Sequence, residues 1–350
     1  MSDSGRESRM ILPSLTRITD FDRRLPDTKP LPRERWSRGD YLVVEMLRDG
    51  PDSYGVETVD GNLLEMVPGD RLIGALGTRA ATLEVVGDWR EIGDDLEMQT
   101  LTAAGVLGVC TSASLQSPEL ANVRYVGHAF RDGEPCRMKD FVTPAGDRRL
   151  EAPVILIIGT SMDSGKTIAA VAAVRELVAM GHRVAGAKVT GVGRLRDILA
   201  MEGAGAGPIM DFVDVGLPST VVPADEYEDS LNLLCSKLAD SDPDVVIVEA
   251  GASPLEPYCG DVAMEVLAKR VSLTILCASD PYAVLGVIEA FGSKPDLVSG
   301  RATSTEAGIR LIKKMTGVTA LNLIDHSTGS EFAAFLEEKL PPGGASSAAS

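Results

Sequence analysis

Between Pro153 and Leu340 the sequence alternates short apolar runs with segments whose apolar residues recur at helical spacing. The apolar runs are residues 154–158, 182–188, 244–249, 272–279, 296–299 and 319–323, and the helical segments are residues 168–180, 226–239, 262–269, 283–291, 304–316 and 330–340. Runs dominated by apolar, often β-branched residues are typical of strands buried on both faces of a parallel sheet. The alternation therefore predicts a doubly wound, mostly parallel α/β domain.

The preceding hundred or so residues have a different pattern, with short apolar runs separated by turn residues. Strands are expected at residues 41–47, 54–59, 71–76 and 82–86, with a hairpin turn at Asp60-Gly61, and a short helix is expected at residues 98–110. This spacing predicts a small β-rich barrel or sandwich without a recognisable catalytic motif. Its polar candidates are Asp70, Arg71, Arg79 and His128, residue types that more often belong to turns and surfaces.

These patterns divide the chain into five segments. Residues 1–35, rich in charge and proline, are expected to be an extended, partly disordered arm, and residues 36–145 the β-rich domain. Residues 146–152 are expected to be a linker, residues 153–340 the α/β domain and residues 341–350 a flexible tail.

The first strand of the α/β pattern is followed by Gly159, five residues, and Gly165-Lys166-Thr167, and then by a helical pattern. Strand, glycine-flanked loop, Lys-Thr and helix is the layout of a phosphate-binding loop (P-loop, or Walker A motif). The glycines let successive N–H groups face phosphate oxygens, the lysine reaches the β and γ phosphates, and the threonine hydroxyl can ligate Mg²⁺. The residues expected to bind the nucleotide are Gly159, Thr160, Ser161, Ser164, Gly165, Lys166, Thr167 and Ile168. A glycine-rich turn with a chance Gly-Lys-Thr is the competing interpretation, but the flanking strand and helix favour the P-loop.

Three further charged residues are expected at the same end of the sheet. Glu249 ends an apolar strand, and Lys188 ends the strand that follows the first helix. Asp197 comes nine residues after Lys188. Since ligands of doubly wound sheets bind at the carboxyl ends of the strands, the two acids could hold Mg²⁺ and the lysine could face the phosphates.

The five-residue loop resembles the Gly-Thr-Asp-Thr-x-x-Gly-Lys-Thr loop of dethiobiotin synthetase and its relatives, including the cobyrinic acid a,c-diamide synthases. That family has Lys-Pro-Val after its second strand, then an Asp, then Val-Glu-Gly-Ala-Gly-Gly. This chain has Lys188-Val-Thr, Asp197 and Val248-Glu249-Ala-Gly-Ala-Ser253 in the same order. The resemblance covers residues 153–325 and leaves the β-rich region unexplained.

The resemblance implies roles for single residues. Lys166 and Lys188 would contact the phosphates and, with Asp163 in the loop, form the catalytic set, while Thr167, Asp197 and Glu249 would hold Mg²⁺. Pro218-Ser219 weakly resembles a substrate-side segment. Apart from the resemblance, Asn322 is expected to contact adenine because it lies near the end of a late strand. The chain departs from the family at two points: no proline follows Lys188, and the glycine-rich turn after Glu249 is Ala-Gly-Ala-Ser. Because that turn binds substrate in the family, the resemblance does not identify the substrate of this chain.

Composition and charge argue against several classes of binding partner. The net charge of −17 argues against nonspecific nucleic-acid binding but not against a nucleotide held by a local loop. The five cysteines have no Cys-x-x-Cys spacing, which indicates neither zinc nor a disulfide framework. No apolar run reaches the length of a membrane span and no signal peptide is recognisable, so we expect a cytoplasmic protein without a membrane partner.

The sequence thus predicts an ATP- and Mg²⁺-dependent enzyme that phosphorylates a carboxylate, carbamate or hydroxyl of a small metabolite, as a ligase or phosphotransferase. Alternatives are a nucleotide-driven switch or assembly factor, and a metabolite sensor. Ser293-Lys-Pro-Asp296 faintly resembles a guanine-binding Asn-Lys-x-Asp motif, which keeps GTP as a weaker alternative to ATP. The related enzymes build their sites at dimer interfaces, so the resemblance also implies a homodimer.

Overall fold

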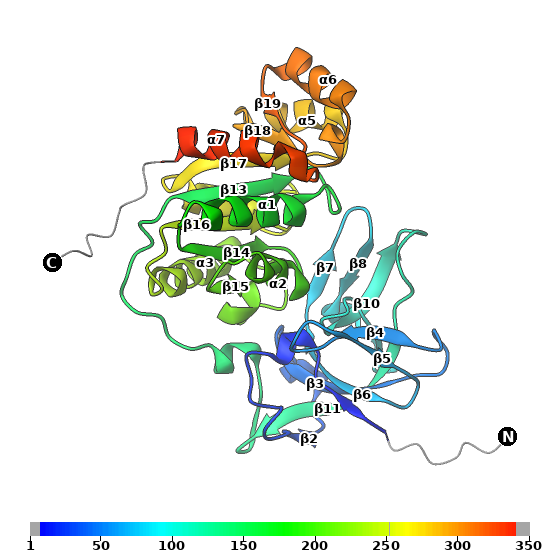
Figure 1. Cartoon of the computed structure of the whole chain (residues 1–350). Coiled ribbons are helices and arrows are strands. Elements are labelled where there is room, and N and C mark those ends of the chain that lie inside the picture. Colours follow the sequence, from blue (N-terminus) through cyan, green and yellow to red (C-terminus); the bar gives the residue numbers. More distant parts are fainter. Residues whose placement is uncertain (1–7, 252, 341–350) are drawn as a thin grey trace. The chain divides into compact units, whose positions relative to one another are not determined.

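The computed structural model describes residues 8–251 and 253–340 of the 350-residue chain. These residues form two compact units (Figure 1). The β-rich unit contains the described residues up to Thr143 together with Val192–Arg196 and Phe212–Val221, and the P-loop unit contains the remainder. Two short segments from within the predicted α/β region therefore group with the β-rich unit. The predicted tail, residues 341–350, lies outside the described residues.

The centre of the β-rich unit is a closed barrel. Strands β6 (Arg71–Leu76), β3 (Tyr41–Met46), β11 (Asn122–Arg131), β9 (Glu97–Thr100) and β10 (Val106–Ala113) pair in this order. An additional parallel pairing of β10 with β6, with Val106 opposite Ala75, closes the ring. Closure leaves the central strands without free edges. Of the two β-rich architectures expected from the sequence, the described strands form the barrel.

Shorter strands extend this barrel. They are β1 (Met10–Ile11), β2 (Asp27–Lys29), β7 (Thr78–Ala80), β8 (Val85–Asp88) and β12 (Glu134–Pro135), and a separate hairpin is formed by β4 (Tyr54–Glu57) and β5 (Leu63–Met66). Gly61 in the hairpin turn has a φ of +78°, a conformation that glycine adopts without strain. The hairpin expected at Asp60-Gly61 is confirmed.

Two sequence predictions for this unit are wrong. The expected helix at residues 98–110 is instead parts of β9 and β10, joined by a turn in which Gly105 has a φ of +96°. The expected arm is not a free segment either, because Leu15 and Phe21 are fully buried and Phe21 packs edge-on against Tyr41. Burial of apolar residues outweighs the high charge and proline content of this segment. Residues 1–7 lie outside the described residues.

The P-loop unit is built on an all-parallel sheet with strand order β15-β14-β16-β13-β17-β18-β19. The strands are β13 (Val154–Gly159), β14 (Val184–Thr190), β15 (Ile209–Asp211), β16 (Val245–Ala250), β17 (Val271–Cys277), β18 (Leu297–Ser299) and β19 (Thr319–Ala320). Every residue of β13, β14 and β16 is buried, as expected for strands covered on both faces. The predicted parallel α/β fold is confirmed.

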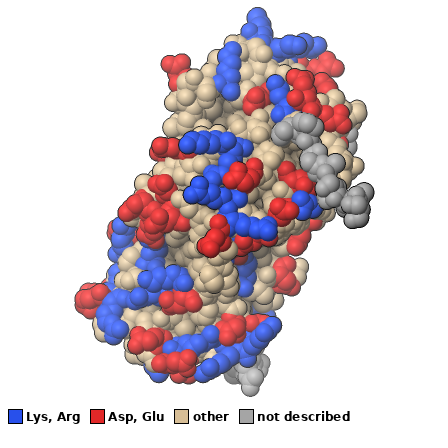
Figure 2. All heavy atoms as spheres, turned by 90° about the vertical axis from the view of Figure 1, so that its left-hand side faces the viewer, with Lys and Arg blue, Asp and Glu red and all other residues tan. Residues whose placement is uncertain are grey.

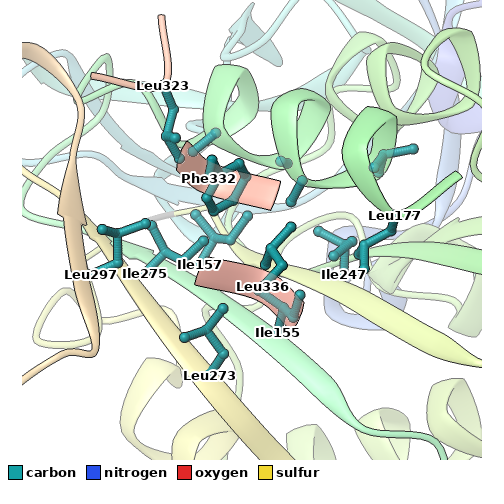
Figure 3. Packing of buried hydrophobic residues seen from close by; sticks show 14 of the residues in the cluster. Ile155, Ile157, Leu177, Ile247, Leu273, Ile275, Leu297, Leu323, Phe332 and Leu336 are labelled. Carbon is teal, nitrogen blue, oxygen red and sulfur yellow. The ribbon is translucent and has the colours of Figure 1, made fainter. Parts of the chain in front are cut away.

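Seven helices accompany this sheet in the described residues: α1 (Lys166–Ala179), α2 (Arg196–Gly203), α3 (Ala224–Ala239), α4 (Gly260–Leu267), α5 (Pro281–Phe291), α6 (Glu306–Thr316) and α7 (Gly329–Lys339). Figure 3 shows how Leu177 of α1 and Phe332 and Leu336 of α7 pack with strand residues such as Ile155 and Ile275. This apolar cluster fixes α1, and with it the loop that precedes α1, on the sheet.

The sequence pattern missed α2 and β15. Both are short, at eight and three residues, and neither has a strong apolar period. In the part of the chain that the structure describes, no helix is long and apolar enough to span a membrane. On the face shown in Figure 2, the basic and acidic side chains of the described residues are interspersed, without a large basic patch.

Candidate nucleotide-binding site

The loop between β13 and α1 is shaped by close approaches that require glycine. A Cβ on Gly159 would lie 2.6 Å from Ser164 Oγ and 2.7 Å from Lys166 Cδ. Gly165, with a φ of +104°, is the N-cap of α1, and a Cβ on Gly300 would lie 2.1 Å from the Ser164 carbonyl oxygen. The loop therefore folds tightly over its own lysine and packs on the chain that follows β18. This is the compact loop at a helix N-terminus that the motif predicts.

Lys166 is the first residue of α1 and is only 5% exposed. Its Nζ donates a hydrogen bond of 2.7 Å to the Ser161 carbonyl oxygen across the loop. Burial lowers the pKa of Lys166, and the nearby Glu249 carboxylate opposes this shift. An anion in the loop would supply the charge that offsets the desolvation of this ammonium group.

Three charged residues lie in one row across neighbouring strands. Lys188 of β14 is in register with Asp211 of β15 on one side and with Glu249 of β16 on the other. Glu249 is in turn in register with Ile157 of β13, the strand that leads into the loop. All three charged residues are buried. Register neighbours in a parallel sheet point to the same face, so the row brings these charges together near the carboxyl ends of the strands.

Glu249 has the features of a metal-binding carboxylate. It is 2% exposed, and its Oε1 accepts a hydrogen bond of 3.3 Å from Thr167 Oγ1. Its Oε2 is buried without a hydrogen-bond partner in the described structure. Burial and the nearby Asp197 carboxylate raise the pKa of Glu249, whereas Lys188 and Lys166 oppose the shift. A buried carboxylate oxygen without a partner, next to a loop threonine, fits Mg²⁺, a cation that one or two carboxylates hold together with water and phosphate.

The other candidate ligand is already paired. Asp197, in the first turn of α2, accepts a hydrogen bond of 2.6 Å from Lys188 Nζ. Burial acts to lower the pKa of Lys188, but the Asp197 and Glu249 carboxylates outweigh it, and the pKa is raised. Gly251 and Gly191 enclose the Lys188 stem, because a Cβ on them would lie 2.5 Å and 3.3 Å from Lys188 Cε. Lys188 is thus a tightly held group whose charged form the neighbouring carboxylates favour. Among the described residues, no three His, Cys, Asp or Glu side chains form a ready-made metal cluster.

The remaining loop residues differ in their surroundings. Thr160 Oγ1 accepts a hydrogen bond of 3.0 Å from the Ser279 amide, which ties the loop to the end of β17. Ser164 is fully buried, and its hydroxyl has no hydrogen-bond partner in the described structure. Asp163 is exposed at a φ of +56°, in the left-handed region. Ser161 contributes its carbonyl oxygen to Lys166, as described above. These four residues lie close together because they belong to one short loop between β13 and α1.

The last two residues expected to bind the nucleotide are Ile168 and Asn322, of which Asn322 is expected to contact adenine. Ile168 is 46% exposed and lines a cavity of about 140 Å³ between α1 and α7, together with Leu323 and Ile324. Asn322 does not line it; its side-chain oxygen accepts a hydrogen bond from the Ile324 amide. Of these two residues only Ile168 therefore lines the cavity, whose wall combines apolar residues with charged ones such as Arg175 and Asp325.

Sequence reasoning missed two acids in the P-loop unit. Asp211 is fully buried and raises the pKa of Lys188, and Glu256 is 9% exposed and close enough to act on Lys166. Glu256 also accepts a hydrogen bond of 2.7 Å from the Ser253 amide. The signal for Asp211 was its place at the end of the apolar run Ile209-Met210, which is too short to stand out. Glu256 carries no sequence signal beyond its distance from the strand.

The polar candidates of the β-rich region do not gather into one cluster. Asp70 pairs with Arg9, Arg71 with Glu45 and Arg79 with Glu84. Each of these three side chains is thus held in an ion pair within the β-rich unit. His128 is fully buried, with Nδ1 2.6 Å from the Tyr125 hydroxyl. Pro218-Ser219 also belongs to this unit, where the Ser219 hydroxyl accepts a hydrogen bond from the Val221 amide.

Comparison with protein families agrees with this geometry. A model described as a domain of unknown function, the DUF1611_C P-loop domain, matches residues 142–318, slightly more than half of the chain. The chain belongs to the DUF1611 family. Its loop, parallel sheet and Lys-Thr pair make the C-terminal unit a P-loop domain, the type of domain that binds nucleotides. A search of curated proteins finds no match.

The solved structures that match this DUF1611 chain resemble it only distantly. HypB from Helicobacter pylori, in complex with nickel, is 16% identical with a TM-score of 0.37, over 54% of this chain and 86% of that chain. A DUF1611 family protein from Anabaena variabilis is 16% identical with a TM-score of 0.33, over 53% and 58%. FtsY from Elizabethkingia anophelis, in complex with GDP, is 14% identical with a TM-score of 0.33, over 51% and 58%. The match spans less than two thirds of the FtsY and Anabaena chains.

Proposed function

We propose that this DUF1611 protein binds ATP with Mg²⁺ and transfers the γ-phosphoryl group to a carboxylate, carbamate or hydroxyl of a small metabolite. The observation that carries the proposal is the convergence of two buried lysines, Lys166 and Lys188, on the buried carboxylate of Glu249 beside the phosphate loop. Phosphoryl transfer depends mainly on positioning and on neutralising charge at the transferring group, which is what this set provides.

Each residue has a distinct part in this proposal. Loop N–H groups and Lys166 hold the β and γ phosphates, for which Lys166 exchanges its hydrogen bond to the Ser161 carbonyl oxygen. Thr167 and Glu249 hold Mg²⁺, with Asp197 next to them in the charge network. Mg²⁺ held there would neutralise the charge that builds up on the phosphates during transfer.

Lys188 is assigned to the acceptor side of the γ phosphate. It lies one strand further from the loop than Glu249, in the order β13-β16-β14. Asp197, Glu249 and Asp211 keep it charged. A fixed ammonium group one strand away from Glu249 can bind both the transferred group and an anionic acceptor. This favours a carboxylate or carbamate substrate.

ATP is favoured over GTP because Lys294 and Asp296, in the segment that resembles a guanine-binding motif, form hydrogen bonds with other parts of the P-loop unit. Asp296 precedes β18 and accepts a hydrogen bond of 2.8 Å from the Thr274 amide, which puts it at the amino-terminal end of β18. Lys294 donates a hydrogen bond of 2.6 Å to the Thr316 carbonyl oxygen at the end of α6. The phosphate loop leaves the carboxyl edge, so neither side chain supports a guanine-binding role.

A nucleotide-driven switch is the second candidate, and one observation favours it. The segment Val192–Arg196 begins four residues after Lys188 and yet groups with the β-rich unit. A change at Lys188 on nucleotide binding could therefore be passed to that unit through the backbone. A switch would hydrolyse ATP without needing a small-molecule acceptor, whereas a transferase would need one.

A two-stage binding and turnover assay tests the proposal. Thermal shifts with ATP, GTP and Mg²⁺ come first, followed by metabolite carboxylates and amines with a non-hydrolysable ATP analogue. Active combinations are then assayed for ADP release. We expect ATP with Mg²⁺ to stabilise the protein, Lys166→Ala to remove that shift, and one metabolite class to raise ADP release. ADP release that no metabolite changes would favour the switch, and the lack of any shift with nucleotide would contradict both.

A further inference from the structure

The turn that follows β18 packs directly against the phosphate loop, and both belong to the P-loop unit. Gly300, with a φ of +87°, lies so close to the loop that a Cβ on it would overlap the Ser164 carbonyl oxygen. The Arg301 amide donates a hydrogen bond of 3.3 Å to the same oxygen. The backbone of Arg301 is thus in contact with the loop two residues before Lys166.

Two further contacts fix the position of this turn. The Ala302 amide donates a hydrogen bond of 2.9 Å to the Ala278 carbonyl oxygen, just after the end of β17. The fully buried Thr303 hydroxyl donates one of 2.9 Å to the Gly300 carbonyl oxygen. None of these hydrogen bonds uses the side chain of Arg301. Backbone contacts therefore hold Arg301 at the loop, and its side chain is left for another role.

The side chain of Arg301 is exposed, and it forms no hydrogen bond or ion pair with the residues that the structure describes. Other arginines of the P-loop unit differ, because Arg183 is paired with Asp244 and Arg310 with Glu306. Carboxylate partners are plentiful in a chain with 51 acidic and 34 basic residues. An unpaired guanidinium beside a phosphate loop suits an anionic ligand, since its planar donors match phosphate oxygens.

Arg301 and Lys188 lie on opposite sides of the loop. The loop follows β13, and the strand order across this part of the sheet is β14-β16-β13-β17-β18. Lys188 lies near the carboxyl end of β14, whereas Arg301 lies two residues beyond the carboxyl end of β18. A phosphate chain held by the loop would therefore lie between these two cations. Because Lys188 is assigned to the γ phosphate, Arg301 is on the side of the phosphate next to the nucleoside.

We propose that Arg301 binds the phosphate chain of the nucleotide from the β18 side, at the α phosphate. It would hold the nucleotide in place rather than act on the transferred group. This assignment rests on the proposed function for the identity of the ligand. The contact between the Arg301 backbone and the loop does not depend on it.

The test compares three variants of the full chain. Arg301→Ala removes the guanidinium and leaves the backbone hydrogen bond to Ser164, so we expect the nucleotide-free variant to melt at the wild-type temperature. Arg301→Lys keeps a charge but lacks the planar set of donors. Lys314→Ala is the matched control. Lys314 is likewise exposed and without a hydrogen-bond or ion-pair partner among the described residues, but it lies in the last turn of α6, which leads to the amino-terminal end of β19.

Calorimetric titration with ADP and with a non-hydrolysable ATP analogue, each with Mg²⁺, measures the contact. We expect Arg301→Ala to bind both ligands about tenfold more weakly, the loss typical of a hydrogen bond between charged groups. Arg301→Lys should lie between Arg301→Ala and the wild type, and Lys314→Ala should bind like the wild type. Wild-type affinity in Arg301→Ala would overturn the proposal. A loss confined to the ATP analogue would place the side chain at the γ phosphate, and an equal loss in Lys314→Ala would show only an effect of net charge; either result would also overturn it.

Inorganic pyrophosphate separates a failure of this inference from a failure of the proposed function. If the wild-type protein binds pyrophosphate but no nucleotide, the proposed function fails. Weaker pyrophosphate binding by Arg301→Ala than by Lys314→Ala would then still support a phosphate-binding Arg301, and equal binding would overturn it. If the wild-type protein binds neither pyrophosphate nor nucleotide, both proposals fail.

Discussion

The Nζ of Lys188 and the Oδ2 of Asp197 lie 2.6 Å apart, although five of the eight residues between them, Val192–Arg196, group with the β-rich unit. The chain leaves the P-loop unit after Gly191 and returns at Asp197. The ion pair therefore joins the end of β14 to the first turn of α2 across this excursion of the chain. This relationship makes Lys188 and Asp197 the natural first targets for mutation.

Lys188→Ala is expected to separate binding from turnover. Loss of a charge contact to the transferring group should cost on the order of 3 kcal/mol of transition-state stabilisation, about a hundredfold in rate. ATP affinity should stay within several-fold, because the loop and Lys166 are intact. Steady-state kinetics with the true acceptor and calorimetry with ATP measure the two effects. Normal turnover would make Lys188 a structural strand residue.

Lys166→Ala is expected to reduce both ATP affinity and turnover. Lys166 lies in the loop itself and is the group assigned to the β and γ phosphates, so its loss acts on the ground state and on the transition state. Calorimetric titration with ATP is the measurement. An affinity equal to that of the wild-type protein would mean that phosphates do not bind in this loop.

Asp197→Asn and Glu249→Gln should each weaken Mg²⁺-dependent turnover while leaving the fold intact. Glu249 offers a buried oxygen without a partner, so we expect the larger effect from Glu249→Gln. Activity measured across a Mg²⁺ titration reports the change as a higher metal requirement. A variant with the wild-type titration curve would have no part in metal binding.

Glu249 also predicts how stability depends on pH. Burial and Asp197 raise the pKa of Glu249 in the folded chain, so the folded state holds this proton to a higher pH than the unfolded state. The free energy of unfolding should therefore fall as pH rises through the raised pKa, and Glu249→Gln should remove that loss. Melting temperatures of the nucleotide-free proteins should show the variant gaining on the wild type from acid to neutral pH. A gap that does not change with pH would contradict the assigned charge.

Gly159→Ala should disrupt the loop by overlap. The added Cβ would meet Ser164 Oγ at 2.6 Å and Lys166 Cδ at 2.7 Å, and overpacking of this kind costs about 1–3 kcal/mol. Gly286→Ala is the matched control, because a Cβ on this exposed position of α5 meets nothing within 4 Å. The control should gain about 0.5–1 kcal/mol from helix propensity and bind nucleotide normally. Equal nucleotide affinity in both variants would count against the loop geometry.

Much of the P-loop unit could be predicted from the sequence because its signals are local. The strands before the loop and before Glu249 are near-continuous apolar runs, and the loop is marked by Gly159, Gly165 and Lys166. The predicted strand at residues 154–158 and the predicted helix at residues 168–180 match β13 and α1 within two residues at each end.

What could not be predicted depends on contacts between distant segments. The amides of Leu195 and Arg196 donate hydrogen bonds to the Glu57 carboxylate, which lies 138 and 139 residues away in the sequence, so no local pattern reveals these contacts. Gly300 is required by the Ser164 carbonyl oxygen, a contact that no local pattern reveals. Residues 98–110 carry helix-compatible residues, but pairing with neighbouring strands makes them β9 and β10, with Gly105 at the turn. Tertiary context overrides local propensity in such short segments.

The central claim is that the loop from Gly159 to Thr167 holds the phosphates of ATP with Mg²⁺ at Glu249. Calorimetric titration of the full chain with ATP and with GTP, each with Mg²⁺ and with EDTA, tests it most directly. The account predicts that ATP binds more tightly than GTP, that Mg²⁺ strengthens binding, and that Glu249→Gln removes most of this Mg²⁺ effect. GTP binding clearly tighter than ATP, or ATP binding that is unaffected by Mg²⁺ and by Glu249→Gln, would contradict it.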